Sequence, residues 1–332
     1  MNMPSSLVTG GAGFIGAHLV RELLSLGHRV VVLDDLSGGF KENVPAGATL
    51  VVGSITDHEL VEKLFADNTF DYCYHLAAYA AEGLSHFIRR FNYTNNLIGS
   101  VNLINASVKH EVKRFVFTSS IAVYGVGELP LRESNTAHPE DPYGVAKLAV
   151  EMDLAAAKSM FGLESTIFRP HNVYGEFQNL GDRYRNVVGI FMNQIMKNAP
   201  LSVFGDGLQT RAFSYVGDIV PAIARCVTME STKGQVFNVG GDHVYSVKQL
   251  AETLLKLAKV SVPLNHLPAR NEVKDAYSDH SKFQKVFGAS SQTTLEEGLA
   301  KMWVWAQQRG VTSTSKFGAI EIEKNLPPSW SV

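Results

Sequence analysis

The sequence predicts an α/β protein in which a doubly wound parallel sheet is followed by a smaller C-terminal α/β lobe. Short β-branched runs alternate with amphipathic stretches of helical length from the N-terminus to about Pro170. A glycine-rich turn joins the first run to the first helical stretch, and beyond Pro170 the alternation loosens. Apolar strands separated by helices are typical of a parallel sheet covered on both faces, and right-handed crossovers make such a sheet doubly wound.

The first half of the chain supplies the elements of the predicted sheet. SLVTG is the first expected strand, and GFIGAHLVRELLSLG has the period of an amphipathic helix that ends at Gly27. Further strands are expected in HRVVVLDDL, ATLVVGSI, FDYCYHLAA, KRFVFTSS and ESTIFRP. Helices are expected in HELVEKLFAD, from about Asn92 to His110, and from Tyr143 onward. We therefore assign residues 1–170 to the parallel-sheet domain.

Residues 171–332 are assigned to the smaller lobe. They include the Gly/Asn/Arg-rich NVYGEFQNLGDRYRN, the apolar helix VVGIFMNQIM, the turn-rich FGDGLQTRAF, the strand QVFNVGG and the helix VKQLAETLLKLAK. No linker separates this lobe from the sheet, so we expect the two to share an interface, with segments that can interleave. The tail after about Thr312 carries no functional signal.

Composition and charge exclude several classes of protein. The 332 residues are 45% hydrophobic with a formal net charge of −2, which argues against a polyanion partner such as nucleic acid. No apolar stretch reaches the ~18 residues of a membrane span, and no signal peptide is visible. Cys73 and Cys226 sit in apolar runs, as buried thiols do in a reducing compartment, and no metal site is expected. We therefore expect a cytoplasmic protein without a membrane or nucleic-acid partner.

The segment TGGAGFIG, after the first strand, is typical of a dinucleotide site. Gly10 permits the tight turn, Gly13 lets the backbone approach a pyrophosphate, and Gly16 lets helix and sheet pack closely. The next strand ends in Asp34, 24 residues after Gly10, where a carboxylate can bind the adenosine ribose hydroxyls and repel a 2′-phosphate. This arrangement predicts a Rossmann domain that binds NAD rather than NADP.

A tyrosine–lysine pair supplies candidate chemistry. Tyr143 and Lys147 are four residues apart in DPYGVAK, where both side chains emerge on one helix face. Asp141 is placed to cap that helix, and Pro142 suits its first turn. An ammonium beside a phenol favours the phenolate, which predicts a pKa for Tyr143 below the usual ~10 and a usable general base. The pair follows the strand FVFTSS, which ends in two serines.

These motifs resemble the extended branch of the short-chain dehydrogenase/reductase superfamily, and within it the UDP-glucose 4-epimerase group. The likeness runs through the G-x-x-G-x-x-G spacing, FTSSIAVYG, DPYGVAK, FRPHNVYGE, LSVFGDGLQTRAFSYVGD and ARNEVKDAYSD. It implies that Tyr143, Lys147 and Ser120 are catalytic, with Ser120 bound to the reacting oxygen. Ser54 stands where an aspartate usually contacts adenine. The implied cofactor contacts are Gly10, Gly13, Phe14, Ile15, Gly16, Asp34, Ser54, Ile55, Leu76, Ala77, Ala78, Asn95, Ser119, Tyr143 and Lys147.

The same resemblance implies that the second lobe holds the nucleotide-sugar. Arg211 and Arg270 would clamp the diphosphate, and Phe204 would stack on uracil. Ala276 falls where some epimerases carry a bulky tyrosine, which implies room for an N-acetyl group at C2. The implied substrate contacts are Ser120, Asn172, Asn186, Val187, Ser202, Phe204, Arg211, Arg270 and Ala276. Helices near 92–110 and 143–161 correspond to those that pair in the group's homodimers.

The activity that this resemblance implies is 4-epimerisation of UDP-glucose and UDP-galactose, with UDP-GlcNAc and UDP-GalNAc as further substrates, by transient C4 oxidation with tightly bound NAD. Related dehydratases and decarboxylases carry acidic residues where this chain has Ile121 and Ala122, which cannot move a proton. UDP-glucuronate stays open as a substrate, because Arg183 and Arg185 could meet a 6-carboxylate. A reductase that releases NAD(P)H and a non-catalytic dinucleotide sensor also stay open, and the retained Tyr–Lys pair disfavours the sensor.

Overall fold

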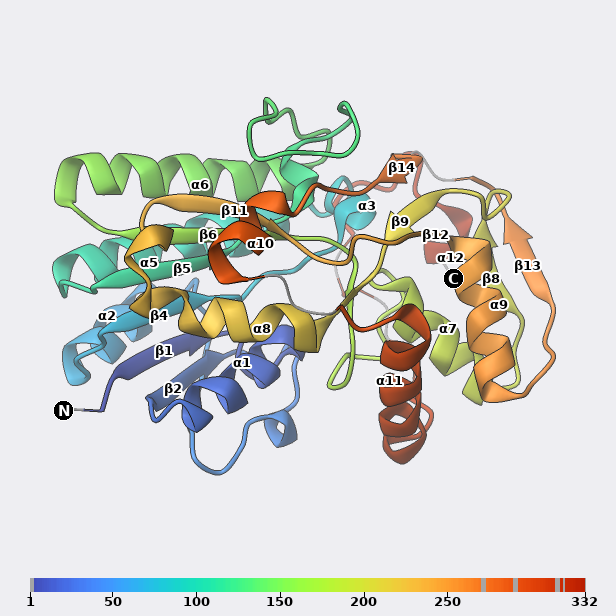
Figure 1. The fold of residues 1–332 in the computed structure, drawn as a ribbon, viewed down its shortest axis with the longest axis horizontal. Helices are drawn as coiled ribbons and strands as arrows, with labels where there is room; N and C mark the ends of the chain where they lie inside the picture. Colours follow the sequence, from blue (N-terminus) through green and yellow to red (C-terminus); the bar gives the residue numbers. More distant parts are fainter. Residues whose placement is uncertain (1–2, 270–272, 289–291, 314–316, 319, 332) are drawn as a thin grey trace.

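The computed structural model describes residues 3–331 apart from 270–272, 289–291, 314–316 and 319. Its centre is a seven-stranded sheet in the order β11-β6-β5-β4-β1-β2-β3, in which every neighbouring pair is parallel (Figure 1). This order reverses at β1, as in a doubly wound nucleotide-binding sheet, and it confirms the predicted fold class. The strands are β1 Ser5–Thr9, β2 Arg29–Asp34, β3 Thr49–Val52, β4 Tyr72–His75, β5 Arg114–Thr118, β6 Ser165–Pro170 and β11 Gln235–Val239.

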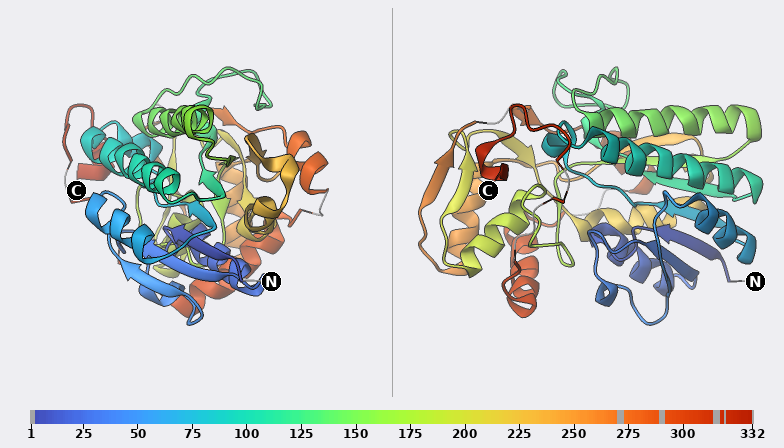
Figure 2. Two further views of the ribbon diagram at one scale, coloured as in Figure 1. Left: turned by 90° about the vertical axis from the view of Figure 1, so that its left-hand side faces the viewer. Right: turned by 180° about the vertical axis from the view of Figure 1, so that it is seen from behind.

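Helices cover both faces of the sheet. One apolar core joins the strands to α2, α5 and α6, and a second joins the opposite face to α1, α8 and α10 (Figure 2). Apolar and polar residues do not alternate along the inner strands, because both faces of these strands are buried. The helices are α1 Phe14–Ser25, α2 His58–Asp67, α5 Gly99–Lys109, α6 Pro142–Phe161, α8 Val216–Arg225 and α10 Ser281–Phe287.

The two predicted domains interleave along the chain. The sheet takes its last strand, β11, and two of its covering helices, α8 and α10, from beyond residue 170. The boundary at 170 therefore marks where the chain first leaves the sheet, and later segments return to it. No helix among the described residues is both long and apolar enough to cross a bilayer.

The smaller lobe lies beyond the carboxyl ends of the strands and has its own apolar core, on the right in Figure 1. Short strand pairs frame it, with β8 beside β13 and β9 between β12 and β14. Its elements are α7 Val187–Met196, β8 Leu201–Phe204, β9 Thr210–Ala212, β12 Val244–Ser246, α9 Val247–Ala258, β13 Leu264–Leu267, β14 Asp275–Ala276 and α11 Leu295–Arg309.

The helix expected from Asn92 to His110 is interrupted. The chain forms α4 (Arg89–Tyr93), a π turn at Thr94–Ile98, and only then α5. Within the turn, the buried Asn96 side chain accepts a hydrogen bond from the Tyr79 N–H (2.8 Å) and donates one to the Tyr79 carbonyl (3.1 Å). π turns are common at functional sites, and this one holds the loop after β4 in place.

The remaining elements are short. The pair β7 and β10 joins the sheet region to the smaller lobe, and α3 and α12 lie near each other in Figure 1. Their bounds are α3 Glu82–Ser85, β7 Val173–Tyr174, β10 Ser214–Tyr215 and α12 Pro328–Ser331, with 3-10 turns at Lys41–Asn43, Ile121–Val123, Cys226–Thr228 and Glu230–Thr232.

Candidate active site

A cavity of about 1940 Å³ opens at the carboxyl ends of the sheet strands and extends into the smaller lobe. Sites for one drug-sized ligand are typically ~300–1,000 Å³. In open α/β sheets, ligands bind beyond the carboxyl ends of the strands, where the strand order reverses. The cavity therefore has the position of a dinucleotide site and room for a second ligand of similar size.

The glycine-rich turn between β1 and α1 has the backbone geometry that a dinucleotide requires. Gly10 has a φ of +72°, and a Cβ there would lie 2.7 Å from the Ala77 nitrogen. A Cβ at Gly16 would overlap the Gly10 carbonyl. Gly13 caps α1 without a side-chain hydrogen bond, so the first N–H groups of the helix are left for a ligand. The helix start therefore fits the pyrophosphate of NAD.

Asp34, at the end of β2, lines the cavity next to this turn. Its carboxylate accepts hydrogen bonds from the N–H groups of Ala12 and Leu36, both at 2.9 Å. Burial raises the pKa of Asp34, and these two hydrogen bonds oppose the increase. Asp34 thus fastens the glycine-rich turn to the loop after β2. Binding of both ribose hydroxyls by the same carboxylate stays a prediction.

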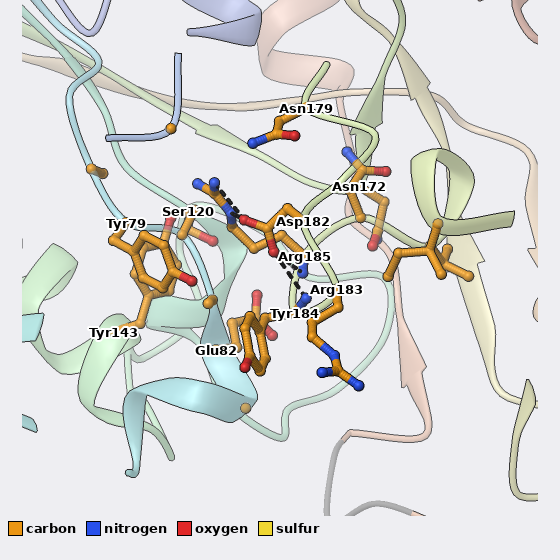
Figure 3. Close-up of a pocket in the computed structure, with 18 of the residues that line it drawn as sticks. Tyr79, Glu82, Ser120, Tyr143, Asn172, Asn179, Asp182, Arg183, Tyr184 and Arg185 are labelled. Atoms are coloured by element: carbon orange, nitrogen blue, oxygen red, sulfur yellow. Dashed lines mark hydrogen bonds and ion pairs between the residues drawn. The ribbon is translucent and has the colours of Figure 1, made fainter. Parts of the chain in front are cut away.

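The first turn of α6 presents Tyr143 to the cavity. Asp141 caps the helix by accepting a hydrogen bond from the Gly144 N–H (2.9 Å), and Pro142 is its first residue, so the predicted cap is confirmed. Ser120, which follows β5, faces Tyr143 (Figure 3), and its hydroxyl opposes the effect of burial on the pKa of the phenol. Ser120 also accepts a hydrogen bond from the Ala122 N–H at 3.1 Å. A phenol and a hydroxyl therefore meet at one point of the cavity wall.

Lys147 lies one helical turn below Tyr143 and is buried. Its ammonium donates a hydrogen bond to the Thr118 carbonyl (2.9 Å) and lies 5.8 Å from the centre of the Tyr143 ring. Burial lowers the pKa of Lys147 to about 7. Burial, reinforced by the charge of Glu82, raises the pKa of Tyr143 well above its ordinary value. The expected decrease in the phenol pKa is therefore wrong for the protein alone, because desolvation of the phenolate outweighs the lowering effects of Ser120 and Arg185.

A buried polar network supports the strand end and the helix beneath this pair. Glu151 forms a bidentate ion pair with Arg169 and accepts a hydrogen bond from Ser119. Arg169 in turn donates to the Tyr124 hydroxyl (2.7 Å), which donates to Asn238 (2.7 Å). The negative charge of Glu151 also opposes the decrease in the Lys147 pKa. The network thus ties β5, β6, β11 and α6 together under the candidate catalytic residues.

One end of the cavity, which we call the sugar end, is built from side chains that the motifs did not identify. Tyr79 follows β4, Glu82 begins α3, and Tyr184 comes from the loop before α7. Arg185 lies over the Tyr79 ring at 4.6 Å and forms an ion pair with Asp182 at 2.6 Å. Figure 3 shows these side chains around the same opening as Tyr143. Arg185 is expected near a 6-carboxylate, whereas the sequence holds no spacing signal for Tyr79, Glu82 or Tyr184, which come from three separate segments.

Nearly all the predicted contact residues lie in the wall of this one cavity. They are Gly10, Gly13, Phe14, Ile15, Gly16, Asp34, Ile55, Leu76, Ala77, Ala78, Asn95, Ser119, Ser120, Tyr143, Lys147, Asn172, Asn186, Val187, Ser202, Phe204 and Arg211. Which of them contact a bound ligand stays a prediction. Arg270 lies outside the described residues.

Two predicted contacts, Ser54 and Ala276, do not line this cavity, and their contact with a ligand stays a prediction. The Ser54 hydroxyl turns to Thr56, with which it makes a 2.8 Å hydrogen bond, and the cavity wall is formed there by Gly53 and Ile55. Ala276 pairs in register with Arg211 in the β14–β9 ladder, whereas Val273 and Lys274, just before it, reach the cavity. The room for an N-acetyl group that the small Ala276 implies stays a prediction.

The nucleotide-side residues are held by backbone contacts in the smaller lobe. Arg211 donates hydrogen bonds to the carbonyls of Val273 and Lys274, both at 2.7 Å. Ser202 exchanges two hydrogen bonds with the Gln194 side chain. Asn186 has a φ of +61° and donates to the Val173 carbonyl at 2.8 Å. The guanidinium of Arg211 is thus fixed at the wall beside Val273 and Lys274.

Comparison with known proteins agrees with this geometry. A UDP-glucose 4-epimerase of Mycolicibacterium smegmatis is 34% identical, over 89% of this chain and 96% of its own. The structure of a Thermotoga maritima UDP-glucose 4-epimerase with UDP-glucose aligns with a TM-score of 0.86 and 34% identity, over 92% of this chain and 99% of that one. A Bacillus cereus UDP-glucuronic acid 4-epimerase with UDP-glucuronic acid and NAD aligns with a TM-score of 0.84 and 28% identity, over 92% and 99%.

The family model described as the NAD dependent epimerase/dehydratase family matches residues 6–240, which is more than half of the chain. That range spans the glycine-rich turn, the Tyr143–Lys147 pair and every strand of the large sheet. The family-level prediction and the expectation of NAD as the cofactor are confirmed. The chain belongs to the NAD-dependent epimerase/dehydratase family.

Proposed function

We propose that this protein is a UDP-hexose 4-epimerase. The observation that carries the proposal is the Tyr143–Ser120 pair, which lies in the wall of one continuous cavity between the glycine-rich turn and Arg211. At the end of β5 the chain continues from Ser120 into Ile121 and Ala122, neither of which can serve as a second acid or base. One proton-transfer centre is sufficient to oxidise and reduce C4, whereas dehydration and decarboxylation need additional groups.

Tyr143 removes the proton from the 4-hydroxyl and later returns it, while Ser120 hydrogen-bonds the same oxygen. NAD, when bound, supplies the hydride acceptor for C4 and the positive charge of its nicotinamide ring. A raised phenol pKa suits this sequence of events, because Tyr143 stays protonated until positive charge is placed beside it. Lys147, anchored on Thr118 and 5.8 Å from the centre of the phenol ring, supports the negative charge. Tyr143 and Ser120 would meet the same oxygen again once the sugar has turned in the cavity, and NAD, when bound, would then supply hydride to the other face of C4.

Charge at the sugar end favours a neutral hexose over a uronic acid. Asp182 neutralises Arg185, one of the two arginines that could meet a 6-carboxylate. Glu82 adds a negative charge close enough to raise the pKa of Tyr143. A carboxylate at C6 of the substrate would be repelled at short range by the negative charge of Glu82. UDP-glucuronate is therefore the second candidate substrate. The N-acetyl group of UDP-GlcNAc carries no charge, so only the space in the cavity bears on whether UDP-GlcNAc binds.

The test is incubation of the purified protein with UDP-glucose, UDP-galactose, UDP-GlcNAc and UDP-glucuronate, followed by analysis of the released sugars. We expect interconversion of UDP-glucose and UDP-galactose without added cofactor and without net NADH. Faster turnover of UDP-glucuronate would transfer the assignment to the second candidate. Stoichiometric NADH release, or no turnover of any 4-hydroxyl sugar, would contradict epimerisation.

A homodimer and a cytoplasmic location belong to the same proposal. The outer face of α6 and the π turn before α5 expose apolar side chains, among them Ile98 (52%), Met152 (66%) and Phe161 (66%). Apolar side chains exposed on neighbouring elements favour a partner of the same kind. Both cysteines are free and buried, which suits a reducing compartment. Sedimentation of Met152→Glu against the unmodified chain tests the dimer, since a monomeric variant is expected, and cell fractionation tests the location.

A further inference from the structure

The C-terminal segment, which comprises residues 317–318 and 320–331, folds back onto the sugar end of the cavity. Ile322, Lys324, Leu326 and Trp330 are among its residues that line the cavity. Its aromatic and aliphatic side chains form one cluster with α3, α4 and the loop before α7. Figure 1 shows the C-terminus beside the smaller lobe, on the other side of the molecule from the N-terminus. The segment thus belongs to the wall of the site.

Backbone and carboxylate contacts anchor the segment to α4. Glu321 accepts hydrogen bonds from the N–H groups of Arg90 and Phe91, both at 2.8 Å, at the start of that helix. The Glu321 N–H donates to the Phe87 carbonyl at 2.8 Å. A carboxylate at a helix start satisfies N–H groups that have no partner within the helix. The anchor lies on the sheet side of the cavity.

Aromatic contacts connect the segment to the opposite side. Trp330 is 5% exposed and lies between Phe87 and Tyr184, with ring-centre distances of 6.0 and 5.4 Å in edge-on geometry. The Phe317 N–H donates to the Tyr184 hydroxyl at 3.1 Å, and the Phe317 ring packs on Tyr79 at 5.2 Å. Tyr184 is therefore held on two sides by the end of the chain.

The packing reaches the residues next to Tyr143. A Cβ added at Gly83 would lie 3.3 Å from the Trp330 ring, so Trp330 packs directly behind the residue that follows Glu82. Glu82 and Tyr184 are both cavity residues at the same end as Tyr143 (Figure 3). Removing Trp330 would leave α3 and Tyr184 without the ring that separates and supports them.

We propose that the C-terminal segment determines sugar specificity, because Trp330 and Phe317 fix Tyr184 and α3 as the wall of the sugar subsite. The inference rests on the proposed function and adds the specificity element to it. The solved Thermotoga relative matches over 99% of its own length while covering 92% of this chain. This chain therefore has residues without a counterpart there, while the shared fold is kept.

The experiment compares Trp330→Ala and a chain that ends at Ser313 with the full-length protein. Val311→Ala is the matched control, because Val311 is 56% exposed and precedes the segment. Affinities for UDP and for UDP-glucose are measured by calorimetry in a Tyr143→Phe background, so that binding is read without turnover. NAD content and circular dichroism report the fold. The ratio of kcat/KM between UDP-glucose and UDP-GlcNAc is measured with Tyr143 intact.

We expect both variants to keep their NAD content and to bind UDP within about twofold of the full-length protein. Their affinity for UDP-glucose relative to UDP, and the kcat/KM ratio between the two sugars, should change by about tenfold or more, the usual effect of altering a few pocket contacts. Trp330→Phe should restore most of the selectivity by returning a ring to the Tyr184 contact. Full-length protein that binds neither UDP nor UDP-glucose overturns the proposed function and this inference with it. Full-length protein that binds both, with unchanged ratios in the variants, overturns this inference alone.

Discussion

The two ends of the cavity are built from different parts of the chain and by different means. At the dinucleotide end, strand ends and a glycine-rich turn present backbone atoms, and positions such as Gly10 and Gly16 leave no space for a Cβ. At the sugar end, side chains from separate loops and the C-terminus make the wall, as Tyr184 and Trp330 do. The dinucleotide end is thus specified by backbone geometry, which tolerates little variation. The sugar end is specified by side-chain packing, which a few residues can change.

The largest expected effect comes from the point where the two ends meet. Tyr143→Phe removes the only hydroxyl that the mechanism uses as a base, so epimerisation should fall by about 10³-fold, within the usual range for a general base. NAD content should stay unchanged, since the ring and Lys147 remain. Initial rates with UDP-galactose and the NAD released on denaturation provide the two measurements. Tyr72→Phe, at the start of β4 and outside the cavity wall, is the control. Full activity of Tyr143→Phe would exclude the phenol from proton transfer.

The second expected effect tests the backbone end. A Cβ at Gly16 would overlap the Gly10 carbonyl, so Gly16→Ala must push α1 away from β1. Overpacking of this kind costs ~1–3 kcal/mol and shifts the helix start that faces the pyrophosphate. We expect the purified variant to retain little NAD, as read by absorbance after denaturation. Gly318→Ala adds the same methyl group in open space and should leave NAD content as it is. Equal NAD content in the two variants would contradict the view that the backbone of the dinucleotide end leaves no room for an added Cβ.

The dinucleotide end is also the part of the site that the sequence predicts well. Three glycines at fixed spacing, an aspartate after the second strand and a Tyr–Lys pair on one helix face are local patterns, so their geometry follows from strand and helix periods. The sugar end depends on contacts between distant residues, such as the Phe317–Tyr184 hydrogen bond across 133 positions. No period connects such positions, and the end of the chain accordingly carries no signal in the sequence. Ser54 and Ala276, which lie outside the cavity wall, are placed as contacts by alignment to a family pattern, where a change in loop length shifts which residue reaches the cavity.

A third prediction concerns two buried histidines that lie near the cavity without lining it. Burial lowers the pKa of His75, on β4, well below its ordinary value, and lowers that of His171, beside Asn172, to about 3. Both rings stay neutral in the folded protein but bind a proton in the unfolded chain below pH ~6.5, so stability is complete above that pH and is lost as pH falls. Each ring should contribute a slope of up to about 1.4 kcal/mol per pH unit between pH 6 and 4. Urea unfolding across this range measures the slope.

The control for this prediction is His243→Gln, which changes an exposed ring. His75→Gln and His171→Gln should each make the stability of the protein less dependent on pH, although both lower it at neutral pH by removing buried hydrogen bonds. A slope that neither substitution reduces would mean that carboxylates, rather than these rings, govern acid unfolding.

The smallest expected effect compares a helix start that faces the cavity with a helix start in the smaller lobe. Asp141 caps α6, whose second residue is Tyr143, and Thr294 caps α11 in the smaller lobe through a reciprocal pair with Glu297. Replacing either cap with alanine should cost about 1 kcal/mol of stability, because one N–H group at the helix start loses its partner. Only Asp141→Ala should also lower kcat, by about fivefold, since a frayed first turn displaces the phenol from Ser120. Thermal melting gives the common loss of stability, and UDP-galactose turnover reveals the difference. Equal kcat values in the two variants would mean that Ser120 and the packing of the ring hold Tyr143 without help from the helix start.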